Sequence, residues 1–347
     1  MRALVVVVAL IGCKQSDPPP PPKPVPPPPP PPVAVAQPCA NIDLVLVSTI
    51  LEEAGHPCRA RVDAVYGRMM ATGAKFSGTL VTTKPTRGAG LVVTCLHCTG
   101  PDGHGLHDPE IPEPSTFQTR GPAHAVGSKV LSGRETQLFF LHRLYSVMPP
   151  KTALDKLGHL TNIEPRHDFV VATISGTPVE VVGHIGAMPN ATVSDTKLAV
   201  HDPETLLAGE TWGNAQTGKQ VLVLGFPSDL PDHAFGGELV ASVGEVLDDA
   251  RAQDMLLRAD PDEAAIAYDP AIEFIVAAHA SSGMSGGGAF DDAGRYLGIA
   301  VRGTVKPVDG KYLVRVVRAQ YVFDQLDAAL AKAPEAMRAK LTPFVAR

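Results

Sequence analysis

Clustered basic charge is absent from this chain of 347 residues, and cysteines and long hydrophobic runs are few. Its 30 lysines and arginines are scattered along the chain and are outnumbered by 36 aspartates and glutamates, which gives a net charge of −6. Nucleic-acid-binding domains gather basic residues on one face or stripe. The sequence therefore predicts no nucleic-acid partner.

The apolar run at the N-terminus, Ala3–Ile11, has only nine residues and follows the single charge of Arg2. A transmembrane helix needs about 20 apolar residues, so this run is typical of a secretory signal instead. The tetrapeptide Leu10-Ile11-Gly12-Cys13 resembles a bacterial lipobox, in which the cysteine is lipidated and becomes the mature N-terminus. An ordinary signal with a chance cysteine is the alternative.

The lipobox resemblance implies a lipoprotein signal peptide over residues 1–12 and a membrane partner bound through lipid on Cys13. Lys14 would be the second residue of the mature protein, where an aspartate would act as a retention signal. Its presence favours the outer membrane or secretion as the destination in a bacterial cell envelope. Proline then fills 13 of the 15 positions from Pro18 to Pro32. Because proline fixes φ and lacks an amide donor, we interpret residues 13–38 as the lipid-anchor cysteine and an extended linker about 45 Å long.

From Cys39 onwards, short β-branched runs separated by turns dominate the sequence. Their density predicts an all-β fold. Two stretches have helical spacing instead. Asn41–Gly55 predicts an N-terminal helix that ends at a glycine, and Ala319–Lys332 places Val322, Leu326 and Leu330 on one face of a C-terminal helix.

The stretch Ser281–Phe290, SSGMSGGGAF, places a hydroxyl nucleophile, Ser285, among four glycines. It lies between two apolar runs, which predicts a strand, a tight loop and a hairpin. Glycine permits positive φ, so the amides of Gly283 and Ser285 can face one small space and form an oxyanion hole. The alternative is a glycine-rich turn whose serine is exposed by chance.

Two other stretches supply the partners that a catalytic serine requires. GLVVTCLHC ends a β-branched strand with His97 beside Cys98, and RHDFVVATI opens an apolar strand with Asp168. The chain order His97, Asp168, Ser285 is that of the chymotrypsin arrangement, whereas α/β-hydrolases and subtilisins use other orders. The order therefore favours one fold among the three.

These stretches resemble motifs of the trypsin-like (chymotrypsin-clan) serine peptidases, in particular the bacterial Deg-type and glutamyl-endopeptidase branches. VTCLHC is similar to VTAAHC, HDFVVATI to DIALL, and GMSGGGAFDDAGRYLGI to GxSGGPxF…GxxxGI. The resemblance implies two six-stranded antiparallel β-barrels. We expect the N-terminal helix and first barrel in residues 39–200, the second barrel in residues 201–317, and the C-terminal helix and tail in residues 318–347.

The resemblance also implies a serine endopeptidase that acts on protein or peptide substrates through an acyl-enzyme, without a cofactor. His97 would be the general base, Asp168 would orient it, and Ser285 would attack the peptide carbonyl. The alternative is a catalytically inactive lipoprotein of the same fold that acts as a binding module.

The same resemblance places a specificity pocket beside the serine. It assigns His279 to the pocket base, and Ala300, Val301, Arg302 and Gly303 to its wall. An imidazole there could favour an acidic substrate side chain. The alternative is that His279 only packs at a strand end.

Four cysteines remain after Cys13, and export to an oxidising compartment predicts two disulfides. Three pairings are possible, of which we favour Cys39–Cys58 and Cys95–Cys98. Cys95 and Cys98 with His104 and His107 also form a C-x2-C-x5-H-x2-H pattern that could bind zinc. The short middle gap and the nearby His97 disfavour this reading, so we expect no metal.

Overall fold

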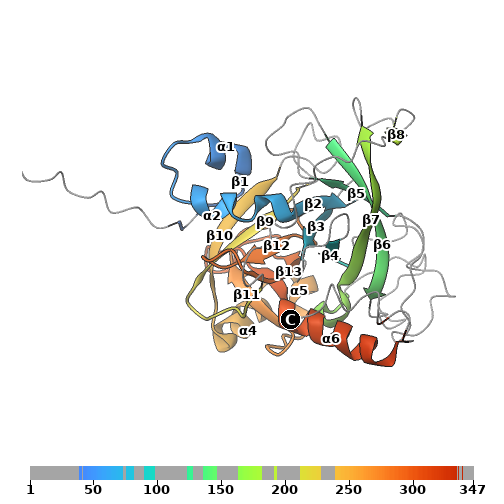
Figure 1. Cartoon of the computed structure of the whole chain (residues 1–347). Helices are drawn as coiled ribbons and strands as arrows, with labels where there is room; N and C mark the ends of the chain where they lie inside the picture. Colours follow the sequence, from blue (N-terminus) through green and yellow to red (C-terminus); the bar gives the residue numbers. More distant parts are fainter. Residues whose placement is uncertain are drawn as a thin grey trace, which may run out of the picture. The chain divides into compact units, whose positions relative to one another are not determined.

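The structure is a computed structural model that describes part of the chain (Figure 1). The described residues are 39–40, 42–72, 76–81, 90–97, 123–127, 136–146, 163–181, 191–193, 212–227, 239–333, 335 and 338. The predicted signal peptide, Cys13 and the proline-rich linker lie outside them. Among these residues, no helix has the length and apolar character needed to cross a bilayer.

Six antiparallel strands in the C-terminal half form a closed barrel (Figure 1). They are β9 (Gln220–Gly225), β10 (Val240–Val246), β11 (Glu273–Ala277), β12 (Gly288–Phe290), β13 (Tyr296–Gly303) and β14 (Val314–Arg318). Their order is β9-β10-β11-β14-β13-β12, and pairing of β12 with β9 closes the ring. The prediction of a six-stranded barrel in this half of the chain is confirmed.

Alternation along the strands gives the barrel two hydrophobic faces. In β9, Val221 and Val223 pack in one core cluster, whereas Leu222 and Leu224 pack in another. Successive side chains of a strand point to opposite faces, so an uninterrupted apolar run indicates burial on both sides. This accounts for the continuous run VLVLG in the sequence.

A second antiparallel sheet contains the strands that precede the barrel. They are β2 (Met69–Thr72), β3 (Phe76–Leu80), β4 (Gly90–Thr94), β5 (Ala123–Gly127), β6 (Thr136–Ser146), β7 (Val170–Val181) and β8 (Ala191–Val193). Their order is β4-β3-β2-β5-β6-β7-β8, and β4 also pairs with β7. The fold is thus mostly β, as predicted, while the first six-stranded barrel stays a prediction.

The N-terminal segment differs from the single helix expected over Asn41–Gly55. It contains β1 (Val45–Leu46), α1 (Val47–Glu52), α2 (Arg59–Asp63) and the 3-10 turn η1 (Tyr66–Arg68). Val45 and Leu46 are extended because they pair with Ala241 and Val240 of β10. Barrel pairing therefore overrides the helical spacing at this end.

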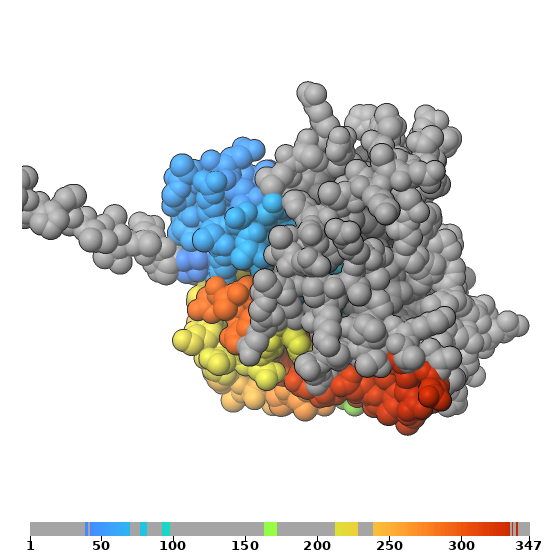
Figure 2. Space-filling view, in the orientation of Figure 1, coloured from blue at the N-terminus to red at the C-terminus, as the bar shows by residue number. Residues whose placement is uncertain are grey.

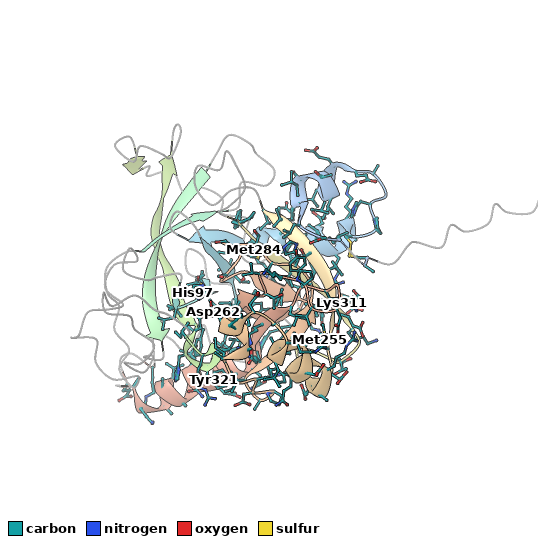
Figure 3. All side chains as sticks on the ribbon, turned by 180° about the vertical axis from the view of Figure 1, so that it is seen from behind. His97, Met255, Asp262, Met284, Lys311 and Tyr321 are labelled. Carbon is teal, nitrogen blue, oxygen red and sulfur yellow. A yellow bond between two sulfur atoms is a disulfide. The ribbon has the colours of Figure 1, made fainter. Side chains whose placement is uncertain are left out.

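The disulfide Cys39–Cys58 is confirmed and ties the chain ahead of β1 to the start of α2. It is drawn as a yellow bond in Figure 3. In Figure 2, the blue surface of this N-terminal segment lies beside the yellow and orange surface of the barrel residues, as the β1–β10 pairing requires. The segment is therefore part of the folded domain, to which β1 contributes a strand beside β10.

The C-terminal helix is confirmed as α6, which spans Ala319–Lys332, and its predicted face of Val322, Leu326 and Leu330 is buried. Two helices between β10 and β11 were not predicted. They are α4 (Asp249–Leu257) and α5 (Pro261–Ala264). Asp248 caps α4 by accepting a hydrogen bond from Arg251 N.

Candidate active site

His97 and Asp168 meet because the strands next to them pair. β4 ends three residues before His97, and the turn η4 (Pro165–His167) delivers Asp168 just ahead of β7. β4 and β7 are antiparallel with Thr94 opposite Val170, so the end of one strand adjoins the start of the other. The positions of His97 and Asp168 are thus fixed by strand pairing.

The contact between His97 and Asp168 uses both carboxylate oxygens. Nδ1 of His97 lies 2.7 Å from Oδ2, and the backbone N–H of His97 donates to Oδ1 at 3.0 Å. Asp168 is fully buried, whereas the His97 side chain is 26% exposed. An ionised carboxylate accepts, so Nδ1 carries the proton and Nε2 is the acceptor nitrogen of the ring. His97 is labelled in Figure 3.

The loop around Ser285 consists of two tight turns. Met284 N donates to Ser281 O, and Gly287 N donates to Met284 O. Gly283 and Gly286 have φ of 89° and 86°, a region that favours glycine. A Cβ on Gly286 would also overlap the carbonyl oxygen of Ser77, so only glycine fits there.

Ser77 of β3 holds this loop through its backbone and its side chain. Its N–H donates to the carbonyl oxygen of Ser285 at 2.9 Å, and its Oγ donates to that of Gly283 at 2.9 Å. Phe226 N donates to the same Oγ, and Thr94 Oγ1 donates to Ser77 O. β3 therefore joins the serine loop to β4, the strand that leads to His97.

The backbone amides expected to form the oxyanion hole are available. Within the described part of the chain, the N–H groups of Gly283 and Ser285 have no hydrogen-bond acceptor. The Ser285 hydroxyl lies 3.4 Å from the carbonyl oxygen of Val301. Its hydrogen bond to His97, which a triad requires, stays a prediction.

A cavity of about 370 Å³ lies beside Ser285. Of the predicted pocket residues, His279, Ala300, Arg302 and Gly303 line it. Val301 does not, because its side chain is buried in the other core cluster from Ala300. Val301 faces the serine with its carbonyl oxygen only.

His279 in the cavity wall is held from two sides. Its Nδ1 lies 2.8 Å from Oδ1 of Asp43, and its ring stacks on Tyr312 with centroids 3.9 Å apart. Sequence reasoning missed Asp43, because Asn41–Gly55 was expected to be a helix and no motif linked it to the cavity.

Arg302 in the same wall belongs to a buried ionic cluster. Its Nε lies 2.6 Å from Oε1 of Glu263 in α5. Behind them, Nε of Arg315 lies 3.8 Å from Glu263 and 3.4 Å from Glu273. Burial raises the pKa of Glu273 to about 7, although the positive charge of Arg315 acts to lower it. Sequence reasoning missed Glu263, which occupies a helix that no motif indicated.

A metal site finds no support in the described residues, which contain no group of three or more histidine, cysteine, aspartate or glutamate side chains placed to bind an ion. Cys95 is disulfide-bonded, so its sulfur is not a thiolate ligand. Cys98, His104 and His107 lie outside the described residues, and the Cys95–Cys98 pairing stays a prediction.

Comparison with known proteins gives likenesses to solved structures alone. No family model and no curated protein matches this sequence. An inactive mutant form of Rv3671c from M. tuberculosis is 16% identical over 79% of this chain and 91% of that chain, with a TM-score of 0.39. The MamO protease domain from Magnetospirillum magneticum is 15% identical over 75% of this chain and 96% of that chain, also with a TM-score of 0.39. At these values neither assigns an activity to this chain.

Proposed function

We propose that this chain is a serine-type endopeptidase of trypsin-like fold that cleaves peptide bonds with His97, Asp168 and Ser285. The observation that carries the proposal is the hydrogen bond between Nδ1 of His97 and the buried carboxylate of Asp168. Strand β4, which leads to His97, is linked through Ser77 to the glycine-rich loop that contains Ser285. A binding module has no need of this arrangement.

The mechanism follows from the protons that His97 can accept and donate and from the nucleophilic oxygen of Ser285. His97 Nε2 takes the proton of the Ser285 hydroxyl as Oγ attacks the peptide carbonyl, and Asp168 stabilises the imidazolium that forms. His97 then gives that proton to the leaving amine, which completes the acyl-enzyme. Water releases the acyl group by the same sequence of proton transfers.

The amides of Gly283 and Ser285 bind the oxyanion of the tetrahedral intermediate in this proposal. Each such donor contributes on the order of 3 kcal/mol to transition-state stabilisation. Their lack of acceptors among the described residues supports this role. Positive φ at Gly283 belongs to the turn that positions its N–H.

The proposal extends to the whole chain. Residues 39–200 would complete a first barrel, which is supported by the additional pairing of β4 with β7. Lipid on Cys13 would tether the enzyme to a bacterial membrane, with the proline-rich linker as a spacer. Fractionation of cells that express the full chain tests the tether, since Cys13→Ala should move the protein from membranes to the soluble fraction. Unchanged partitioning rejects it.

Peptide hydrolysis by the purified full chain tests the activity. We expect Ser285→Ala and His97→Ala each to lower kcat by about 10³-fold or more while the protein stays folded. A Ser285→Ala protein with the wild-type rate rejects the proposal. A folded wild-type protein that binds peptides and cleaves none supports the inactive binding module.

A further inference from the structure

The cavity beside Ser285 contains an arginine whose terminal nitrogens have no partner in the described part of the chain. Arg302 lines the cavity, and its side chain is 19% exposed. Its hydrogen bond to Glu263 uses Nε alone. Nη1 and Nη2 therefore remain to donate to a ligand.

Arg302 is held in place by a helix outside the barrel. Glu263 is only 4% exposed, and it belongs to α5, whose N-cap residue Asp260 accepts hydrogen bonds from Val305 N and Lys306 N. One short helix thus fixes both the guanidinium and the backbone at the edge of the cavity. A fixed guanidinium loses little side-chain freedom when it binds a ligand.

Among the described residues that line the cavity, the other ionisable side chain is His279, and it is already engaged. Nδ1 of His279 is paired with Asp43, and the His279 ring is stacked on Tyr312. Asp43 places a negative charge beside that imidazole, whereas Arg302 always carries its positive charge. Arg302 is therefore the group in the cavity that best meets an anion.

We propose that the cavity accepts an aspartate or glutamate side chain from the substrate, with Arg302 as its specificity-determining residue and Glu263 as the positioning residue for Arg302. This inference rests on the proposed peptidase function, because Ser285 lines the same cavity. A substrate side chain next to the attacked carbonyl enters a space that adjoins the nucleophile. A planar guanidinium binds a carboxylate through two N–H donors, and it repels lysine and arginine.

Matched peptides test the substrate class on the wild-type full chain. They differ only in the residue directly on the N-terminal side of the cleaved bond. This residue is Glu, Gln, Asp, Asn or Lys. We expect kcat/KM for Glu to exceed that for Gln by roughly 10- to 100-fold, the range of a charged hydrogen bond, with Lys lowest. Equal values for Glu and Gln, or a preference for Lys, overturn the inference.

Variants test the assigned residues through the Glu:Gln ratio of kcat/KM, which a general loss of activity does not change. Arg302→Gln should bring the ratio close to one, and Arg302→Lys should keep part of it. Glu263→Gln should lower it less, mainly through a higher KM for the Glu peptide. Arg258→Gln is the matched control, because Arg258 pairs with Asp254 and Asp309 at the surface, and its ratio should stay that of wild type. A ratio that Arg302→Gln leaves unchanged overturns the assignment.

Binding to Ser285→Ala protein separates this inference from the catalytic proposal. Calorimetry with the Glu and Gln peptides should show at least tenfold tighter binding of Glu, whether or not wild type cleaves either peptide. Tighter Glu binding without cleavage by wild type rejects the peptidase and supports the acidic pocket. Cleavage without a Glu preference in binding or rate rejects the pocket and supports the peptidase.

Discussion

Ser77 donates its backbone N–H to the carbonyl oxygen of Ser285 at 2.9 Å, across 208 positions of the sequence. The Oγ of the same Ser77 donates to Gly283 O and accepts from Phe226 N. A residue of β3 therefore fixes the loop that carries the proposed nucleophile. The geometry of that loop depends on both halves of the chain.

Ser77→Ala should lower activity without removing any reacting group. The variant loses the Oγ bonds to Gly283 O and Phe226 N and leaves Phe226 N without that acceptor in the buried interior, which costs about 2 kcal/mol of unfolding free energy. The serine loop loses one support, so we expect kcat to fall about tenfold or more.

Ser242→Ala is the control for Ser77→Ala. Ser242 is also buried, and its Oγ accepts from Leu44 N. Denaturant unfolding and peptide hydrolysis should show lost stability in both variants and lost kcat in Ser77→Ala alone. Equal kcat in both variants contradicts a positioning role for Ser77.

Asp168→Asn should leave the fold intact and lower kcat by about 10³- to 10⁴-fold. An amide at this buried position no longer holds the His97 tautomer with the proton on Nδ1, and it does not stabilise the imidazolium. Single-turnover hydrolysis measures the effect on the chemical step. A loss below tenfold would show that His97 does not act as a base oriented by Asp168.

The disulfide Cys39–Cys58 should stabilise the domain by about 3 kcal/mol, because it closes a loop between residues 19 positions apart. The Cys39→Ala/Cys58→Ala double variant should show this loss in denaturant unfolding. Reducing agent should destabilise wild type more than the double variant. Equal sensitivity of the two proteins to reduction contradicts the prediction.

Glu273 should give the folding stability a pH dependence of definite sign. Burial raises the pKa of its carboxyl from 4.5 to about 7, so the folded state holds more protons than the unfolded state between these values. Stability from this group is therefore full below pH 4.5 and is lost as the pH rises towards 7, by about 3 kcal/mol in all.

Unfolding of Glu273→Gln across that pH range isolates the effect. The stability difference between wild type and Glu273→Gln should shift against wild type as the pH rises from 4.5 to 7. Glu52→Gln, a change at an exposed acid, is the control and should follow the wild-type profile. A pH-independent difference for Glu273→Gln rejects the raised pKa.

Local sequence patterns predicted the elements whose conformation depends on neighbouring residues in the sequence. The spacing in Ala319–Lys332 gives α6 because its apolar face is also the buried face. Near Val45 the same kind of spacing gave a wrong helix start, since backbone pairing with β10 extends these residues. Local periodicity contains no information on such long-range pairing.

The site was predictable only where motifs indicate it. His97, Asp168 and Ser285 follow from three ordered motifs, and the structure brings the first two into contact. Ser77 and Glu263 carry no comparable signal. A serine in a strand and a glutamate in a helix are common, and their roles arise from partners more than 30 positions away.

A fluorophosphonate probe tests the central claim most directly, because it forms a covalent bond only with an activated serine. Peptide mapping of the labelled full chain should place the adduct on Ser285, and His97→Ala should slow labelling by about 10³-fold or more. Folded wild-type protein that takes up no probe at Ser285 would contradict the account.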